Sequence, residues 1–211
     1  MNRLIILVIF IFVGILSISA KTEKFGTWVE MEFTKTFLKK FEFSFIPEVR
    51  WQDDFTVDKY QFDGRLAYQP FKFLEVAAAY RIKTNVKAKG DVVTHRLVLD
   101  AKISKNFNRF KTSLRARYTT YNNVDGDGKT NFVRPRIKAA YDIKGNKFTP
   151  FTSYELFQNL SDKVLQKGRF DIGVSRKMGK MHRLAIFYRL QHYYVDRPSI
   201  NILGIDYRFK I

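Results

Sequence analysis

Apolar and polar residues alternate one by one along most of this chain. In the stretch 41–52, every odd position carries an apolar side chain and most even positions are polar or charged. A period of two predicts β-strands, because successive side chains of a strand point to opposite faces. The alternating segments are about 10–13 residues long, which exceeds the usual 5–6 residues of soluble strands and suits a tilted membrane-crossing strand of roughly 9–11.

Eleven such segments follow one another. They are residues 25–35, 41–52, 59–69, 71–83, 92–104, 109–121, 132–143, 148–158, 169–178, 183–193 and 200–211. Short connections at 36–40, 70, 105–108, 144–146 and 179–181 alternate with longer ones at 53–58, 84–91, 122–131, 159–168 and 196–199. Outer-membrane barrels have an apolar outside, short periplasmic turns and longer external loops. The pattern therefore predicts an all-β fold, a single antiparallel up-and-down transmembrane β-barrel of 10–12 strands.

The number of strands conflicts with the expected topology. Eleven strands that end on the periplasmic side place the start of the first strand outside, whereas an exported N-terminus should stay in the periplasm, and bacterial barrels usually have even counts. Three explanations are open. Either residues 20–24 form a further short strand, or the first segment lies in the lumen, or one segment is wrongly identified.

The first twenty residues have the features of a secretory signal peptide. A polar start with Asn2 and Arg3 precedes an apolar run at 4–16 and small residues at 17–20. A helical anchor is the alternative, but the run is short for one. We expect residues 21–211 to form the barrel in the outer membrane of a Gram-negative bacterium. The chain has no cysteine, which excludes a lipid-anchored precursor, disulfides and thiolate metal sites.

The formal net charge is +18, and the basic residues are spread over the inward positions of many strands. An exported chain rarely meets nucleic acid, so outer-membrane lipid is the expected partner and nucleic acid is not. The predicted lumen charge network consists of Glu48, Arg50, Arg65, Arg81, Arg96, Arg115, Arg117, Arg134, Arg136, Glu155, Arg169 and Arg189. Its simplest role is an internal set of ion pairs. A passage or site for a small anionic solute is the second role, and catalysis by Glu48 and Glu155 the third.

Other candidate chemistry is sparse. Residues 123–128 resemble the start of a calcium loop, but Arg134 stands where the loop needs its last carboxylate, so a turn is expected. His95, His182 and His192 lie far apart in the predicted barrel. A serine hydrolase site on the lipid-facing surface has no nucleophile motif to support it. We expect no cofactor and no metal.

Several charged–aromatic motifs are familiar. They are Phe25-Gly26-Thr27-Trp28, Glu48-x-Arg50, Tyr80-Arg81, His95-Arg96, Arg115-x-Arg117-Tyr118, Pro150 with Glu155-Leu156-Phe157, Tyr188-Arg189 and Gly204-x-Asp206-Tyr207. Together they resemble the bacterial domain-of-unknown-function family twenty-four ninety, from about Phe25 to the end. The resemblance implies an exported barrel and brings no catalytic or ligand residues.

The last segment resembles the signal that barrel-assembly machinery reads in a final strand. Its alternating apolar residues are Leu203, Ile205, Tyr207, Phe209 and Ile211, although Ile211 replaces the usual terminal aromatic residue. The machinery is therefore an expected partner during biogenesis. The leading functional expectation is a non-enzymatic outer-membrane barrel, either a narrow pore or a structural barrel with a net basic lumen. An outer-membrane enzyme acting on lipid or peptide and a periplasmic ligand-binding barrel are the alternatives.

Overall fold

The computed structural model describes residues 22–123, 129–194 and 197–211, and its regular elements are all β-strands. The strands are β1 (Thr22–Phe37), β2 (Phe41–Gln52), β3 (Val57–Phe71), β4 (Leu74–Asn85), β5 (Val92–Phe107), β6 (Phe110–Asn123), β7 (Lys129–Tyr141), β8 (Phe148–Asn159), β9 (Leu165–Met178), β10 (His182–Tyr193) and β11 (Ser199–Lys210). Among the described residues, no helix is long and apolar enough to cross a membrane. The predicted signal peptide and calcium-like loop lie outside the described residues, except Asn123 at the end of β6.

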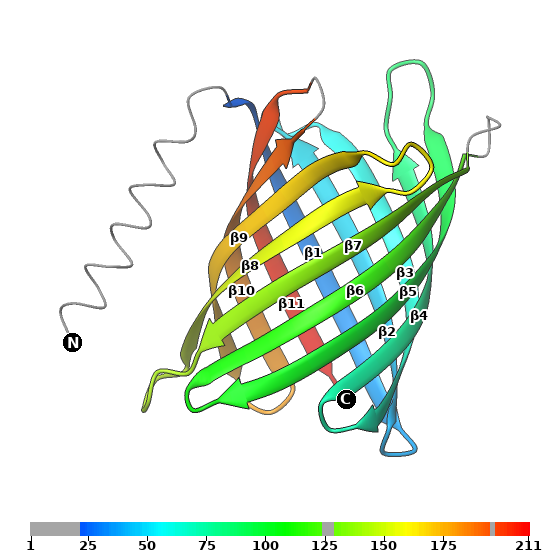
Figure 1. The fold of residues 1–211 in the computed structure, drawn as a ribbon. Coiled ribbons are helices and arrows are strands. Elements are labelled where there is room, and N and C mark those ends of the chain that lie inside the picture. The colour runs from blue at the N-terminus through cyan, green and yellow to red at the C-terminus, as the bar shows by residue number, and fades with distance from the viewer. Residues whose placement is uncertain (1–21, 124–128, 195–196) are drawn as a thin grey trace.

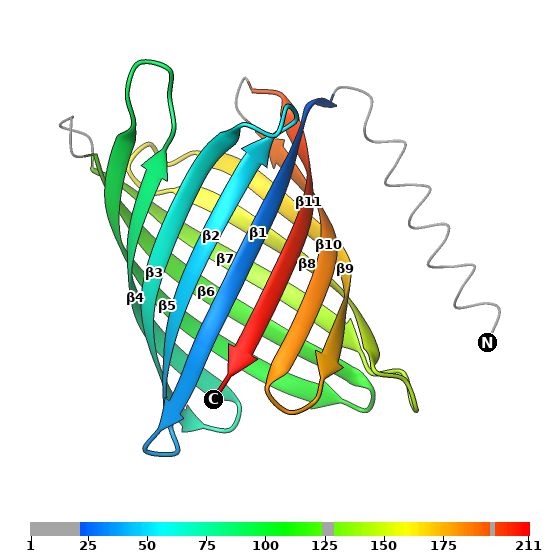
Figure 2. The same ribbon diagram turned by 180° about the vertical axis from the view of Figure 1, so that it is seen from behind.

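The eleven strands form one closed barrel in which each strand pairs with its neighbours in sequence and β1 pairs with β11 (Figures 1 and 2). The prediction of an all-β barrel of 10–12 strands is confirmed. The prediction of purely antiparallel pairing is wrong at one seam, because β1 and β11 run parallel from Thr22 beside Ser199 to Thr34 beside Lys210. An odd number of strands that alternate in direction can close only through a parallel pair. Figure 2 shows both strands pointing to the same end.

The parallel seam accounts for the odd strand count without any of the three explanations: residues 22–24 belong to β1, and all eleven predicted segments are strands. The first segment is a full strand of the wall, bonded to β2 on one side and β11 on the other, and it begins at Thr22. We call the end with connections 53–56, 86–91 and 160–164 the loop end, and the end with connections 38–40, 72–73 and 179–181 the turn end. β1 starts at the loop end, and the chain finishes at the turn end (Figure 1).

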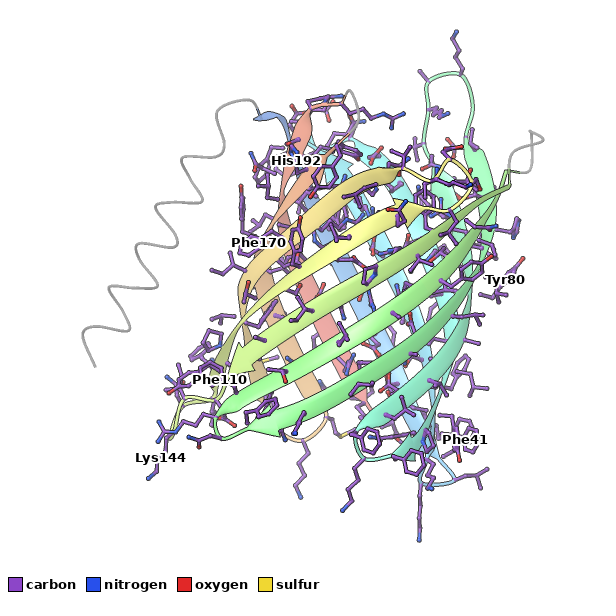
Figure 3. The ribbon with its side chains drawn as sticks, viewed as in Figure 1. Phe41, Tyr80, Phe110, Lys144, Phe170 and His192 are labelled. Carbon is purple, nitrogen blue, oxygen red and sulfur yellow. The ribbon has the colours of Figure 1, made fainter. Side chains whose placement is uncertain are left out.

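The alternation sorts side chains between the two faces of the wall. Leu97 and Leu114 are 44 % and 56 % exposed on the outside, whereas Arg96 and Arg115 beside them are each 8 % exposed on the inside. Aromatic rings border the outer surface at both ends. Phe25 and Tyr194 are exposed toward the loop end, and Figure 3 shows Phe110 near the turn end. Cross-strand ring pairs such as Phe110–Tyr141, with centroids 5.0 Å apart, strengthen the lower border.

Prolines account for irregular points in the wall. Pro70 was predicted to form a turn, but it lies inside β3, and the connection is at 72–73. The β3–β4 register shifts between Tyr68 and Phe71, so Pro70, which has no N–H to donate, lies in an irregular stretch. The β1–β2 ladder is likewise interrupted opposite Pro47, and the β7–β8 ladder at Pro135.

Candidate functional site

Two cavities occupy the lumen. The first, the turn-end chamber, has a volume of about 310 Å³, and the second, the loop-end vestibule, about 610 Å³. Five residues line both cavities and so lie between them: Trp28, Arg50, Arg81, Arg134 and Arg169. The two cavities therefore meet at a level where arginine side chains contact a tryptophan.

Every member of the predicted lumen charge network lines one of these cavities. Arg96 lines the vestibule alone, and Arg50, Arg81, Arg134 and Arg169 line both cavities. The members that line only the chamber are Glu48, Arg65, Arg115, Arg117, Arg136, Glu155 and Arg189. The alternation of the strands is sufficient to direct all of these side chains inward, because each occupies the face opposite the exposed apolar residues.

Three bidentate arginine–aspartate pairs connect adjacent strands inside the barrel. In each pair both guanidinium nitrogens donate to the two carboxylate oxygens at 2.5–2.9 Å, and the two residues stand directly opposite each other in the strand register. The pairs are Arg81–Asp63, Arg117–Asp100 and Arg189–Asp171. Charge-assisted bonds of this geometry are among the stronger ones in proteins. The three aspartates were not in the predicted network, although their inward parity marks them.

Glu155 on β8 is the centre of the largest ionic cluster. Arg115 donates to its Oε1 at 2.5 Å, Arg134 donates to both oxygens at 3.1 and 3.2 Å, and the Arg169 Nη1 lies 3.9 Å away. Glu48, in contrast, accepts hydrogen bonds from Arg50 and Gln61. The two glutamates proposed as a catalytic pair thus belong to different groups of partners, and each acts as a counter-ion.

An arginine–aromatic layer lies at the level where the two cavities meet. We define it by Trp28, Phe157, Arg50, Arg134 and Arg169. The Arg50 guanidinium lies 3.5 Å from the centroid of Trp28, and those of Arg134 and Arg169 lie 4.1 and 4.5 Å from Phe157. Cation–π attraction holds the guanidinium groups across the bore. Phe157 is 2 % exposed, and the predicted lumen charge network did not include it.

A second aromatic side chain packs against glycines of the wall. Phe187 on β10 stands opposite Gly173 on β9 and Gly204 on β11, and it forms a buried cluster with Phe151 and Ala185. A Cβ at Gly204 would overlap the Phe187 ring. Covering glycine with a neighbouring aromatic ring is a known device of β-sheets. This apolar cluster lines one part of the chamber.

The two cavities differ in charge. Thirteen Lys and Arg residues and nine Asp and Glu residues line the chamber, so most cations there have carboxylates nearby. Nine Lys and Arg residues line the vestibule with only three acids, Asp53, Asp58 and Asp162. Cations thus exceed acids by four in the chamber and by six in the vestibule, with four arginines counted in both cavities.

The histidines do not form a site together. His95 bonds to Tyr80 at 2.8 Å, His182 to Tyr207 at 2.6 Å, and the Nδ1 of His192 to the Ser199 hydroxyl at 2.9 Å. Within the part of the chain that the structure describes, no group of three or more His, Cys, Asp or Glu residues could hold a metal ion. The outer face of β11 carries Leu203, Ile205, Tyr207 and Phe209, in the alternation expected for an assembly signal.

Comparison with curated proteins and with solved structures gives no match. A family model described as a protein of unknown function (DUF2490) matches residues 25–200. This is the family twenty-four ninety that the charged–aromatic motifs resemble, so the resemblance is confirmed. With most of its length matched, the chain belongs to the DUF2490 family of proteins of unknown function.

Proposed function

We propose that the protein is a non-enzymatic barrel of the Gram-negative outer membrane, with a narrow lumen that admits small anions or none. The observation that carries this proposal is that the polarity of the two faces is the reverse of that in a soluble barrel. Exposed Leu, Ile, Val and Phe side chains cover the outside of a closed barrel, while buried arginines and carboxylates fill the inside. Soluble monomers rarely expose so large an apolar surface, whereas lipid is its natural solvent.

The same inversion argues against a soluble ligand-binding barrel. Such a barrel has its apolar face inside, where the ligand binds, but here Arg115, Arg134 and Glu155 are inside and each 8 % exposed or less. Exposed aromatic residues toward both ends of the outer surface fit the two interfaces of a membrane. The proposal includes the predicted export signal at 1–20 and insertion by barrel-assembly machinery.

Membrane insertion is tested by adding one charge to either face of β6. Leu114→Arg places the charge on the outer face, where a lipid-exposed arginine costs about 2–4 kcal/mol near the bilayer midplane. Ser113→Arg is the matched control, because it adds the same charge one residue away on the inner face. In vesicles, Leu114→Arg should lower the free energy of unfolding by more than Ser113→Arg, whose added charge faces Lys138 but also the carboxylates of the lumen. Recovery of the native protein from the periplasm without detergent, or equal effects of the two variants, would refute the proposal.

The state of the lumen is tested by planar-bilayer recording. The arginine–aromatic layer narrows the bore, and the basic excess repels cations, so we expect either no channel or a small anion-preferring one. If current flows, Arg115→Glu combined with Arg117→Glu should shift the reversal potential toward cation preference. A large cation-selective conductance of the native protein would contradict both the narrow bore and the sign of its field.

A further inference from the structure

The loop-end vestibule contains positive charge that its own carboxylates do not compensate. Its three acids are close to the rim and have local partners. Asp58 forms an ion pair with Lys59, Asp162 accepts a hydrogen bond from Asn159 at 2.7 Å, and Asp53 accepts one from the backbone N–H of Asp54 at 3.1 Å. The part of the vestibule farther from the rim is lined by cations and neutral groups.

Two lysines define this deeper part. Lys83 on β4 is half-buried and forms no ion pair with any described carboxylate. The same is true of Lys167 on β9, whose Nζ lies 4.6 Å from the Phe157 ring centroid and 5.5 Å from that of Tyr193. Arg96 repels Lys83 and Arg169 repels Lys167 inside the same cavity, so an anion bound between the two lysines would reduce this repulsion.

The shape of the vestibule suits a small ligand. Its volume of about 610 Å³ lies within the roughly 300–1,000 Å³ of ligand pockets. The arginine–aromatic layer lies at its lower end, and Gln61, Asn159 and Gln191 also line it. Arg169 already donates its Nε to Gln191 at 2.8 Å, which holds its guanidinium in place. A ligand that enters from the loop end therefore meets ammonium, guanidinium and amide donors together.

We propose that the vestibule is a binding site for a multivalent oxyanion, namely a phosphoryl group, either free phosphate or a phosphate monoester. Clustered guanidinium and ammonium groups match phosphate oxygens in both geometry and charge. A divalent anion relieves the repulsion between the lysines more than a halide does, because the attraction scales with its charge. This inference rests on the proposed function and adds the identity of the solute: a phosphoryl group is the anion that the lumen would take up from the loop end.

The test is direct titration of the full barrel, purified in detergent, with inorganic phosphate, glycerol phosphate and chloride at matched ionic strength. Both tryptophans of the chain, Trp28 and Trp51, line the vestibule, so their fluorescence reports binding, and calorimetry checks it. We expect saturable binding of one or both phosphates and none of chloride. Saturation by phosphate alone assigns the free ion, and tighter binding of glycerol phosphate assigns the monoester.

A matched pair of double variants locates the site. Lys83→Gln with Lys167→Gln should weaken phosphate binding by at least about tenfold, as expected when charge-assisted hydrogen bonds are lost. Lys102→Gln with Lys138→Gln removes two lysines from the chamber and should weaken it by less than about threefold, since the net change in charge is the same but the place is different. Equal weakening by both pairs, or no saturable phosphate binding by the native protein, overturns the inference.

The outcomes separate this inference from the proposed function. Anion-preferring conductance or membrane insertion without phosphate binding rejects the vestibule site and leaves the proposed function standing. Phosphate binding by a protein that fractionates as a soluble periplasmic barrel rejects the outer-membrane proposal, while the site is retained. In bilayers, phosphate added on the loop side should also reduce any chloride current more than phosphate added on the turn side.

Discussion

Replacing Glu155 by glutamine removes the carboxylate on which the largest ionic cluster depends. Its side chain is 6 % exposed, and it accepts bonds from Arg115 at 2.5 Å and from Arg134 at 3.1 Å, with Arg169 at 3.9 Å. Glutamine keeps the volume, so no cavity forms, but three buried guanidinium groups lose their shared counter-charge. Breaking a buried ion pair in this way typically costs about 3–5 kcal/mol. We expect the free energy of unfolding to fall by that amount.

The assay is urea unfolding of the barrel refolded into lipid vesicles, followed by tryptophan fluorescence and by the heat-dependent shift in gel mobility. Glu75→Gln is the matched control. Glu75 also bonds two cations, Arg65 at 2.6 Å and Lys102 at 2.8 Å, but its side chain is 23 % exposed, and water screens the loss. We expect a change of about 1 kcal/mol or less for this variant.

A double variant separates charge imbalance from a general loss of contacts. In Glu155→Gln with Arg134→Gln, one uncompensated guanidinium is removed together with the carboxylate, so part of the lost stability should return. The reasoning is refuted if Glu155→Gln destabilises no more than Glu75→Gln. It is also refuted if the losses from the two single changes simply add, because independent contacts would then explain the data.

Two further predictions concern packing and sidedness. Gly204→Ala should destabilise the barrel by about 1–3 kcal/mol, because its Cβ would overlap a buried phenylalanine ring. Gly64→Ala has open space at that position and should be neutral within about 1 kcal/mol. Equal unfolding midpoints of the two variants would contradict this. In the cysteine-free chain, Lys24→Cys and Lys89→Cys should react with an impermeant maleimide from the same side of the membrane and Lys180→Cys from the other, and labelling of Lys24→Cys together with Lys180→Cys would rule out the parallel seam.

The strands and their faces could be predicted because both are local. A period of two fixes which side chains share a face, and β2 even has the predicted bounds of 41–52. The turn expected at Pro70 was wrong because proline also fits where a ladder is irregular, and that irregularity depends on β4. Local pattern thus indicates that a strand exists more reliably than it indicates where the strand ends.

The closure and the clusters could not be predicted because both depend on residues far apart in the chain. The parallel seam joins Thr22 to Ser199, and no local feature of either segment selects its partner. The Glu155 cluster draws Arg115 from β6, two strands away, so it depends on the tilt of the strands and on the reach of long side chains. The alternation of inward and outward positions alone could still have added Asp63 to the predicted lumen charge network and placed Phe157 inside the barrel.

The inward charges help to fix the register of strand pairing, which the apolar outer face alone cannot fix. A slip of one strand by two residues keeps every apolar side chain facing outward, so the outer face alone does not fix the register. One such slip between β3 and β4 would place Asp63 opposite Ala79, and the other would place Asp63 opposite Lys83 but Arg81 opposite Arg65, a pair of like charges. A slip between β9 and β10 would separate Asp171 from Arg189 in the same way. Since an unpaired buried charge is strongly unfavourable, the cross-strand ion pairs exclude the slipped arrangements, and the charged lumen fixes the register of this barrel whether or not it also conducts.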